Sequence, residues 1–408
     1  MPKKERRKAS NRHSHLNKRL LLPQVRVMAT HEPTQADSSR SRVRVELGER
    51  SYDIRFYHDE PDALACDLAP YCPERALIVS NPTIWNLHGE ALASALTRAG
   101  VEFIVELIGD GEEFKTLATA STLYDRLIRE CFTRRACVIA FGGGVVGDLA
   151  GFVAATFMRG VTFIQVPTTL IAMVDSAVGG KTGVDHPLGK NLIGAFYQPR
   201  LVAVDLAYLR TLDDHNFRGG LAEVIKYGMI ADAEFFAWLE GAIGAALAHD
   251  PAVLERIVKR SCEIKSQVVG ADERESGLRA ILNYGHTFGH AIESLGQYRG
   301  LGDQPVAQFH GQAVAIGMNA AADLAVRMGL LTDQERERQR ALIEAAGLPT
   351  RLPEPLRADD LIARMYGDKK VAGGKLRFVL PHAIGHVELH SDVPETQLRQ
   401  ALGAIGAV

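Results

Sequence analysis

The 408-residue chain has few cysteines and no long apolar run, and each shortage excludes a class of protein. Its five cysteines include no Cys-x-x-Cys pair, which argues against a disulfide scaffold and favours a reduced, cytoplasmic protein. No stretch of about 18 uncharged apolar residues is present, so we predict no membrane-spanning helix. A hydrophobic fraction of 46% with 24% charged residues excludes a mainly disordered or collagen-like chain.

Positive charge is concentrated at the start of the chain. Residues 1–27 carry nine Lys or Arg against one acid, Glu5, so the rest of this chain of net charge −2 carries −10. The segment has no aromatic residue to stack on bases, no amphipathic period and no apolar core of a secretory signal. A nucleic-acid-binding arm and a transit peptide are the alternatives. We favour a disordered extension over residues 1–44, or translation that starts at Met28, and predict neither a nucleic-acid nor a membrane partner.

Two hydrophobic patterns divide the remaining chain. Runs of strand length alternate with helical stretches up to residue 209, which predicts an α/β domain over 45–209 with a mostly parallel sheet. Amphipathic stretches then predominate, so we predict an all-helical domain over 210–408, with ligand sites between the two. The predicted strands are a hairpin within 43–56, then 76–80, 101–107, 136–141 and 161–166, and the predicted helices are 84–99, 115–130, 221–248, 251–270, 284–296, 311–328 and 333–346.

A glycine-rich turn follows the predicted strand 136–141. Gly142, Gly144 and Gly147 fit G-x-G-x-x-G, a pattern that lets a pyrophosphate approach the backbone at a helix N-terminus. The acidic residue expected after the next strand is absent, because that strand ends in Gln-Val-Pro. We therefore predict a Rossmann-like dinucleotide site of variant form. The alternative is that the glycines only allow tight packing of helix on strand.

A second glycine segment, Gly179-Gly180-Lys181-Thr182, is similar to the end of a P-loop. The pattern requires a glycine five residues before Gly180, where this chain has Asp175, and no apolar strand immediately precedes the segment. ATP hydrolysis is therefore not predicted. We interpret the segment as a flexible loop that brings Lys181 toward an anion.

Histidines and one carboxylate form a candidate metal site. His286 and His290 are spaced i,i+4, His310 opens the next helical stretch, and Glu223 lies in an otherwise apolar helix. Two neutral imidazoles, one carboxylate and an open fourth position describe a catalytic zinc site. Spacing alone does not decide which histidines bind the metal, and an isolated histidine pair can also be plain polar surface or core.

Cations lie among glycine and apolar residues in this otherwise acidic body. Singly, each is explained as a surface side chain with a buried stem. Together with a metal they indicate a substrate that carries more than one negative charge. They are Lys181, Lys190, Lys226, Lys265, Arg279, Lys369 and Lys370.

Seven motifs, in order, make the chain from about residue 45 to 395 resemble the 3-dehydroquinate synthase family of sugar phosphate cyclases. The resemblance implies NAD and a divalent metal, usually Zn²⁺ with Co²⁺ as an alternative, and a homodimer. It also implies conversion of 3-deoxy-D-arabino-heptulosonate 7-phosphate to 3-dehydroquinate and phosphate in the shikimate pathway, which leads to chorismate and the aromatic amino acids. The motifs are GEEFK (111–115), FGGGVVGDLAGFVAATFMRG (141–160), VPTTLIAMVDSAVGGKTGVD (166–185), GKNLIGAF (189–196), GGLAEVIKYG (219–228), LRAILNYGHTFGHAIE (278–293) and DKK (368–370).

The same resemblance implies roles for individual residues. The implied metal ligands are Glu223, His286 and His310. The implied NAD contacts are Glu112, Lys115, Gly143, Gly144, Val145, Asp148, Thr168, Thr169, Lys181, Lys190 and Thr211. The implied catalytic residues are Asp175, Lys181, Lys226, Lys265, Arg279, Asn283 and His290. The implied substrate contacts are Lys190, Asn191, Lys369, Lys370 and, from the partner subunit, Arg159.

The implied reaction is a transient oxidation by NAD, elimination of phosphate, re-reduction and an intramolecular aldol closure. Two features depart from the family pattern: Gln312 replaces a glutamate near the metal site, and residues 299–308 look like an insertion before His310. The alternatives are a sedoheptulose 7-phosphate cyclase and a metal- and NAD-dependent polyol dehydrogenase. The first usually alters the cations that this chain retains, and the second would release NADH. A catalytically inactive scaffold would lack ligands, and none is missing.

Overall fold

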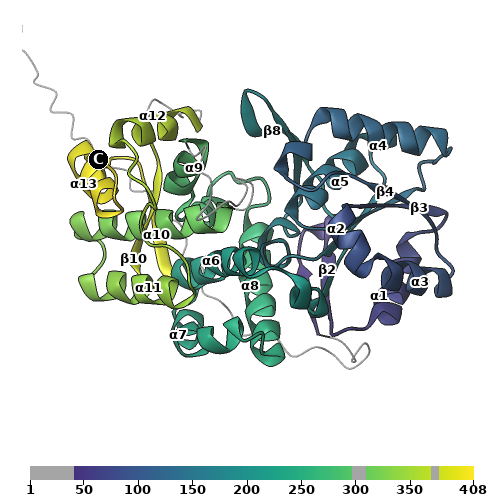
Figure 1. The fold of residues 1–408 in the computed structure, drawn as a ribbon, viewed down its shortest axis with the longest axis horizontal. Helices are drawn as coiled ribbons and strands as arrows, with labels where there is room; N and C mark the ends of the chain where they lie inside the picture. The colour runs from purple at the N-terminus through teal and green to yellow at the C-terminus, as the bar shows by residue number, and fades with distance from the viewer. Residues whose placement is uncertain (1–40, 296–308, 369–375) are drawn as a thin grey trace, which may run out of the picture.

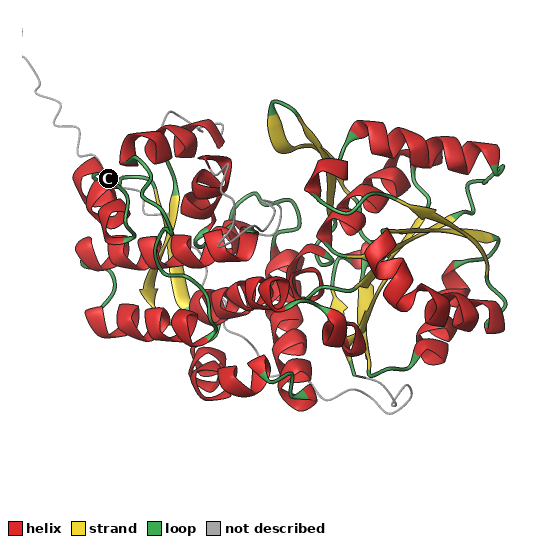
Figure 2. Cartoon of the chain, viewed as in Figure 1, coloured by secondary structure: helices red, strands yellow, loops and turns green. Residues whose placement is uncertain are grey.

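The computed structural model describes residues 41–295, 309–368 and 376–408 (Figure 1). A strand-rich half and a helix-rich half occupy opposite ends of the molecule, and helices α6 and α8 lie between them (Figures 1 and 2). The predictions made for the basic segment, the insertion at 299–308 and the Lys369–Lys370 pair concern residues outside the described ranges, apart from residues 41–44.

A seven-stranded, mostly parallel sheet forms the centre of the first half. Its strand order is β1-β2-β9-β6-β5-β3-β4, in which β1 is antiparallel to β2 and every other neighbouring pair is parallel. The predicted hairpin and the mostly parallel sheet are therefore confirmed. The strands are β1 (Arg42–Val45), β2 (Tyr52–Tyr57), β3 (Arg75–Ser80), β4 (Glu102–Leu107), β5 (Cys137–Gly142), β6 (Thr162–Pro167) and β9 (Leu201–Asp205).

Helices cover both faces of this sheet, and the alternation of side chains along each strand explains how (Figure 1). Leu77 and Val79 of β3 pack with α4 and α5 on one face, whereas Ala76 and Ile78 belong to the cluster on the other face with α1 and α3. Because both faces are buried, the central strands are continuous apolar runs. The helices are α1 (Pro61–Leu68), α2 (Pro82–Ile84), α3 (Glu90–Arg98), α4 (Leu117–Arg129) and α5 (Gly144–Thr156).

The second half consists mainly of helices, as predicted. Their starts are fixed by capping side chains: Asp213, Asp232 and Asp250 each accept a hydrogen bond from a first-turn backbone amide. Within the described residues, no helix has the length and apolar character needed to cross a bilayer. The helices are α6 (Asp214–Ala231), α7 (Ala233–Leu247), α8 (Pro251–Ala271), α9 (His286–Leu295), α10 (His310–Arg327), α11 (Asp333–Ala345), α12 (Ala358–Asp368) and α13 (Glu395–Ala404).

Glycines allow α10 to approach its neighbours more closely than any side chain would permit. A Cβ on Gly311 would collide with the backbone of Gly219 in α6, and a Cβ on Gly317 would collide with the carbonyl oxygen of Gly285. Gly285 itself has φ +78°, a left-handed conformation that favours glycine. These contacts place the first residues of α9 and α10 beside the middle of α6.

Two antiparallel hairpins correct the prediction. β7 (Lys181–His186) pairs with β8 (Gly189–Phe196), so the segment after Gly180 is a strand packed against α5 rather than the flexible loop we expected. β10 (Phe378–Ala383) pairs with β11 (His386–His390) inside the region expected to be all helical. Such short strands carry too little periodic signal to be recognised among glycines and histidines.

Candidate active site

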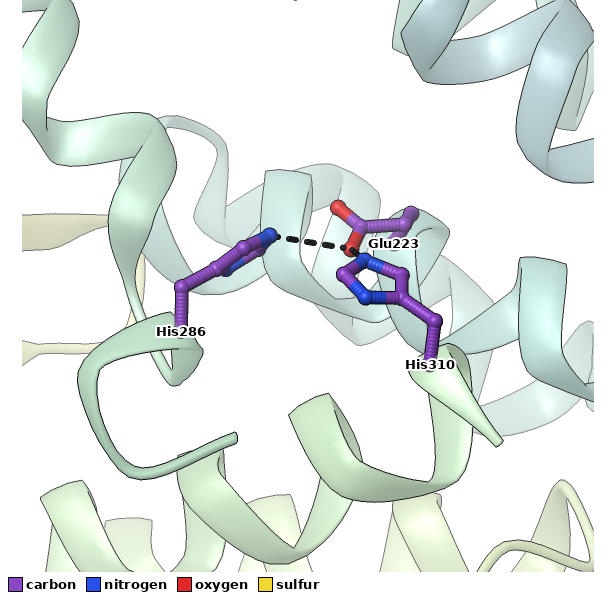
Figure 3. A group of neighbouring side chains, drawn as sticks. All are labelled: Glu223, His286 and His310. Carbon is purple, nitrogen blue, oxygen red and sulfur yellow. Dashed lines mark ion pairs between the residues drawn. The ribbon is translucent and has the colours of Figure 1, made fainter. Parts of the chain in front are cut away.

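Three side chains with metal-binding atoms meet in the helical half (Figure 3). Glu223 comes from the middle of α6, and His286 and His310 are the first residues of α9 and α10. The Nε2 atoms of His286 and His310 lie 3.4 Å and 3.6 Å from the same oxygen, Oε1 of Glu223. Tetrahedral zinc with bonds of about 2.0–2.1 Å holds its ligand atoms about 3.4 Å apart. The spacing therefore suits one metal ion.

Both histidines are held through their Nδ1 atoms. Nδ1 of His286 lies 3.0 Å from the carbonyl oxygen of Tyr284, which can only accept a hydrogen bond, so this nitrogen carries the proton. Nδ1 of His310 lies 3.2 Å from Oε1 of Glu293. Each contact leaves Nε2 directed toward Glu223. Partners of this kind fix the tautomer and orientation of metal-binding histidines.

Burial and charge set the protonation of the triad. Burial opposes ionisation of Glu223, but Lys226 and His286 outweigh it and lower the pKa of this carboxyl to about 2. Burial lowers the pKa of His286 to about 3, so its imidazole is neutral. Burial also opposes charge on His310, yet Glu293 and Glu223 outweigh it and raise the pKa of His310 well above its usual value. The carboxylates of Glu223 and Glu293 thus both lie beside His310 and favour its protonated form. A divalent cation could take the place of that proton.

The Glu223 carboxylate itself tests whether a metal fits. It is fully buried, and within the described residues neither oxygen has a hydrogen bond of acceptable geometry, although Lys226 forms an ion pair with it. A buried carboxylate with unused lone pairs is unfavourable unless a further partner binds it. A cation held by Glu223, His286 and His310 would be that partner.

His290 lies beside the triad rather than opposite Glu223. Its ring is perpendicular to that of His286, with centroids 5.4 Å apart. It forms a second group of nearby ligand atoms with Glu293 and His310. The helical i,i+4 spacing of His286 and His290 therefore does not identify the pair that faces the carboxylate. The partner of His286 in that pair is His310, 24 residues away in the sequence.

A second cluster of charges, centred on Asp175, joins the two halves of the molecule. Asp175 lies in the short π-helix η6 (Ala172–Ser176), and its Oδ1 is 2.5 Å from Nζ of Lys265 on α8 and 3.9 Å from Nζ of Lys226 on α6. The hydroxyl of Tyr227 donates to the same oxygen at 2.9 Å. Burial opposes ionisation of Asp175, but Lys265 and Lys226 outweigh it and keep the pKa of Asp175 well below its usual range.

Three further residues predicted to contact substrate gather around a loop carboxylate. Glu275 forms an ion pair with Lys181 and accepts a hydrogen bond from Nδ2 of Asn283 at 2.7 Å. Arg279 is buried nearby and donates to the carbonyl oxygen of Gly179 at 3.1 Å. Arg279 and Asn283 belong to a separate turn, η8 (Leu278–Asn283), because Gly285 interrupts the chain before α9.

The predicted dinucleotide segment lies where β5 meets α5. Gly143 is the N-cap of α5 and has no side chain that could cap the first amides of the helix. A Cβ on Gly143 would lie 3.2 Å from Thr169, and one on Gly144 would lie 3.1 Å from Ser176. Thr168 is buried, with a hydroxyl that has no hydrogen bond among the described residues. An uncapped helix N-terminus beside a buried hydroxyl suits a phosphate.

The other residues predicted to contact NAD form a contiguous group. Nζ of Lys115 lies 2.7 Å from Oδ2 of Asp148 and 2.6 Å from Oδ1 of Asn191. Nζ of Lys190 lies 3.9 Å from Glu112. Asn191 has φ +56°, and its amide donates to Asp185. The structure thus brings the GEEFK motif, helix α5 and hairpin β7–β8 together.

Two predicted residues lie apart from these clusters. Thr211, in the turn η7 (Leu206–Thr211), shares a 2.7 Å hydrogen bond with His88. Arg159 is exposed, in the turn η5 (Phe157–Arg159), and makes no ion pair with any described residue. Neither position brings the side chain to Glu223 or Asp175 within this chain.

Sequence reasoning missed three residues that support the site: Glu293, Tyr227 and Glu275. For Glu293 a signal existed, because it follows His286 by seven residues and so lies on the same helical face. Tyr227 and Glu275 gave none, since their contacts are with Asp175 and Lys181, far away in the sequence. Gln312 donates to the carbonyl oxygen of His215 at 3.2 Å, so the carboxylate beside His310 is that of Glu293.

The chain is similar to known proteins over most of its length. The chain matches the family models "3-dehydroquinate synthase N-terminal" over residues 105–219 and "3-dehydroquinate synthase C-terminal" over 220–371. A 3-dehydroquinate synthase from Picosynechococcus is 50% identical over 86% of this chain and 95% of its own length.

Solved structures show the same fold. The 2-epi-5-epi-valiolone synthase ValA from Streptomyces hygroscopicus, with NAD+ and Zn²⁺ bound, is 32% identical with a TM-score of 0.79, over 88% of this chain and 98% of that chain. A 2-deoxy-scyllo-inosose synthase complexed with carbaglucose-6-phosphate, NAD+ and Co²⁺ is 26% identical with a TM-score of 0.80, over 89% and 99%.

The role of Glu293 can be tested by metal binding. Glu293→Gln keeps the shape of the side chain but removes the charge that orients His310, so we expect the affinity for Zn²⁺ to fall by about 10–100-fold. The measurement is competition with a chromophoric chelator. Glu275→Gln, which removes a carboxylate paired with a lysine instead, is the matched control and should bind as the wild type does. Equal affinities for all three proteins would contradict the orienting role.

Proposed function

Since the chain belongs to the 3-dehydroquinate synthase family, we propose that the Glu223 triad and the Asp175 cluster together form its active site. The activity is that of 3-dehydroquinate synthase in the shikimate pathway, a lyase that eliminates phosphate. The substrate of that enzyme is a sugar phosphate that also carries a carboxylate. The observation that carries the site proposal is the convergence of Glu223, His286 and His310 beside a lysine cluster, inside the segments that match the family.

We propose NAD and a divalent metal, Zn²⁺ or Co²⁺, as cofactors. Support comes from the related cyclases, whose structures hold NAD+ with one or the other metal, and from the unused lone pairs of Glu223. When bound, the metal lowers the pKa of a coordinated hydroxyl and NAD accepts and returns a hydride. The residues proposed to hold NAD are the N-terminus of α5, with Thr168 and Thr169, and the group of Glu112, Lys115 and Asp148.

Lysine and arginine side chains of this chain are proposed to provide the remaining electrostatic stabilisation. Phosphate departure and the aldol closure both develop negative charge on oxygen, which preorganised donors stabilise in a water-poor site. Lys226 and Lys265 are buried and held by Asp175, so their ammonium groups keep their positions without reorganisation. Arg279, Lys181 and Asn283 lie around Glu275 and are proposed to bind the anionic groups of the substrate. Lys190, Asn191 and the Lys369–Lys370 pair are proposed to complete that set.

His290 is proposed as a catalytic residue that lies beside the metal and the reacting groups. Its ring is 5.4 Å from that of His286 and 6.2 Å from that of His310, measured between centroids, so it is near any group bound to the metal without being aimed at Glu223.

We propose that two chains associate, with Arg159 reaching the phosphate bound by the partner. Arg159 is exposed, and the neighbouring Met158 and the hairpin residues Leu188 and Leu192 expose 43%, 89% and 69% of their surface. Exposed apolar side chains of this size favour a contact surface.

We propose a domain boundary between residues 209 and 210. Support comes from the two family models, which meet between residues 219 and 220. The cytoplasmic location stays a prediction.

The proposal is tested by measuring phosphate release from 3-deoxy-D-arabino-heptulosonate 7-phosphate with NAD and Zn²⁺. We expect phosphate without net NADH, and loss of activity on chelation that added Zn²⁺ restores. His286→Ala should lose turnover together with the metal held by the Glu223 triad. Net NADH formed from a polyol would instead identify a dehydrogenase. Unchanged metal content in His286→Ala would contradict the assignment of His286 as a metal ligand. It would not contradict the proposed activity.

The pKa of Lys265 predicts the pH above which kcat declines. Burial lowers the pKa of Lys265 to about 8, and Asp175 only partly opposes this. If the charged form is required, kcat falls as the pH rises through about 8. Lys265→Arg should remove that decline, because a guanidinium keeps its charge, and Lys265→Met should lower kcat by about 10²–10³-fold. Lys259→Arg, on the same helix, is the control. A wild-type profile in Lys265→Arg would show that another group sets the limit.

The proposal that Arg159 acts in the active site of the partner subunit predicts complementation between two inactive variants. Arg159→Ala lacks the arm and His286→Ala lacks the metal site, but a mixed dimer contains one complete site if the arm acts across the interface. Mixing equal amounts after dissociation should restore about a quarter of the wild-type activity, since half of randomly paired dimers are mixed and each has one working site. No recovery above the single variants would mean that Arg159 does not act in the partner's site.

A further inference from the structure

A separate cluster of histidines lies on the hairpin β10–β11, and none of its residues takes part in the site described above. Nε2 of His382 lies 2.8 Å from Nε2 of His390 and 3.7 Å from Oε2 of Glu388. The three ligand atoms all lie within 4.8 Å of one another, as those of the Glu223 triad do. Nε2 of His386 contacts the other oxygen of Glu388 at 3.2 Å.

The strand register explains why these side chains meet. His386, Glu388 and His390 occupy alternate positions of β11 and therefore share one face of the hairpin. The pairing shifts between Pro381 and Ala383, which is where His382 lies. A bulge of this kind redirects a side chain, and here the histidine of β10 joins the three residues of β11. The cluster thus connects both strands.

The contacts have the form of a metal site. Two Nε2 atoms 2.8 Å apart cannot both carry a proton, so at least one ring directs a lone pair at the other. A tetrahedral ion with Zn–N bonds of about 2.0–2.1 Å needs ligand atoms about 3.4 Å apart. The distances of 2.8 Å and 3.7 Å lie on either side of that value. His386 holds the second carboxylate oxygen, as an orienting partner does for a metal-binding carboxylate.

We propose that His382, Glu388 and His390 form a second divalent-metal site, for Zn²⁺ or another first-row transition ion that prefers imidazole. The donor set of two imidazoles and one carboxylate suits zinc, nickel and copper and disfavours magnesium and calcium. The ligands are partly exposed, with 26% of His382 and 29% of Glu388 accessible, whereas Glu223 of the first site is fully buried. A water therefore completes the coordination, and the site binds its metal less tightly than the triad does.

The position of the hairpin indicates what the ion would do. Gly385, at the turn, donates its amide to the carbonyl oxygen of Met229 at the end of α6, and Glu335 of α11 accepts from the amide of Ile384. The hairpin is thus anchored at its turn, and a metal joining His382 to His390 would fasten the two strands to each other along their length. The expected effect is on the stability of the hairpin, because its three ligands are different residues from those of the Glu223 and Asp175 clusters.

The experiment measures how many equivalents of Zn²⁺ the complete protein binds. Chelator-treated protein with NAD is titrated with Zn²⁺ alone, and bound metal is measured after desalting. Wild type should bind two equivalents, the weaker one removable by a mild chelator without loss of phosphate release. The double variant His382→Gln/His390→Gln should bind one equivalent and keep full activity, whereas His286→Ala should retain only the weaker equivalent. His386→Ala should lower the weaker affinity by about 10–100-fold.

A control and a second measurement complete the test. His58→Ala removes another exposed histidine that faces a carboxylate, Glu255 at 3.5 Å, but no second imidazole, and it should bind two equivalents. Hydrogen exchange of the β10 and β11 amides should slow when the second equivalent binds wild type, and should not change with Zn²⁺ in the double variant. One equivalent in wild type, or two in the double variant, would overturn the proposal whether or not the main activity is confirmed.

Discussion

The buried carboxylate of Glu223 is the constraint on which the site depends. An ionised group without solvent is tolerated only when opposite charge and coordination compensate for its lost hydration. Lys226 supplies one partner from the next turn of α6, and two imidazoles supply the ligands that a cation would share. The glycines of α10 make this convergence sterically feasible, because they let the helix contact α6 and the turn before α9 directly.

The charges next to Glu223 continue across the molecule. Lys226 contacts Asp175 as well as Glu223, and Lys265 contacts Asp175, so carboxylates and ammonium groups alternate from the helical half to the strand-rich half. Removing any one member would take a charged partner away from its neighbours. This alternation explains how an acidic body can hold several lysines in fixed positions. The same hydrophobic cluster also includes residues of both halves, so the two are packed as one body.

The two histidine clusters show that the residue types of a metal site do not by themselves define its role. In the triad, burial and backbone or carboxylate partners fix each imidazole, and Lys226 forms an ion pair with the carboxylate. On the hairpin, the ligands are partly exposed and no lysine or arginine pairs with Glu388 among the described residues. The first arrangement supports chemistry on a bound substrate, and the second supports a link between strands.

The sequence by itself determined the strand–helix alternation, the parallel sheet and the residue types at the site. These depend on local period and on motifs, such as the glycine turn after β5, that are read along the chain. Residue spacing could not decide that His310 rather than His290 faces Glu223, which only the family resemblance implied, nor that Glu293 is the carboxylate beside His310. Sequence patterns also did not predict strands β7 to β11, although residues that lie in them were named. Those outcomes depend on how α6, α9 and α10 pack, and contacts between residues far apart in the chain leave no periodic signal. Only the tertiary structure decided them.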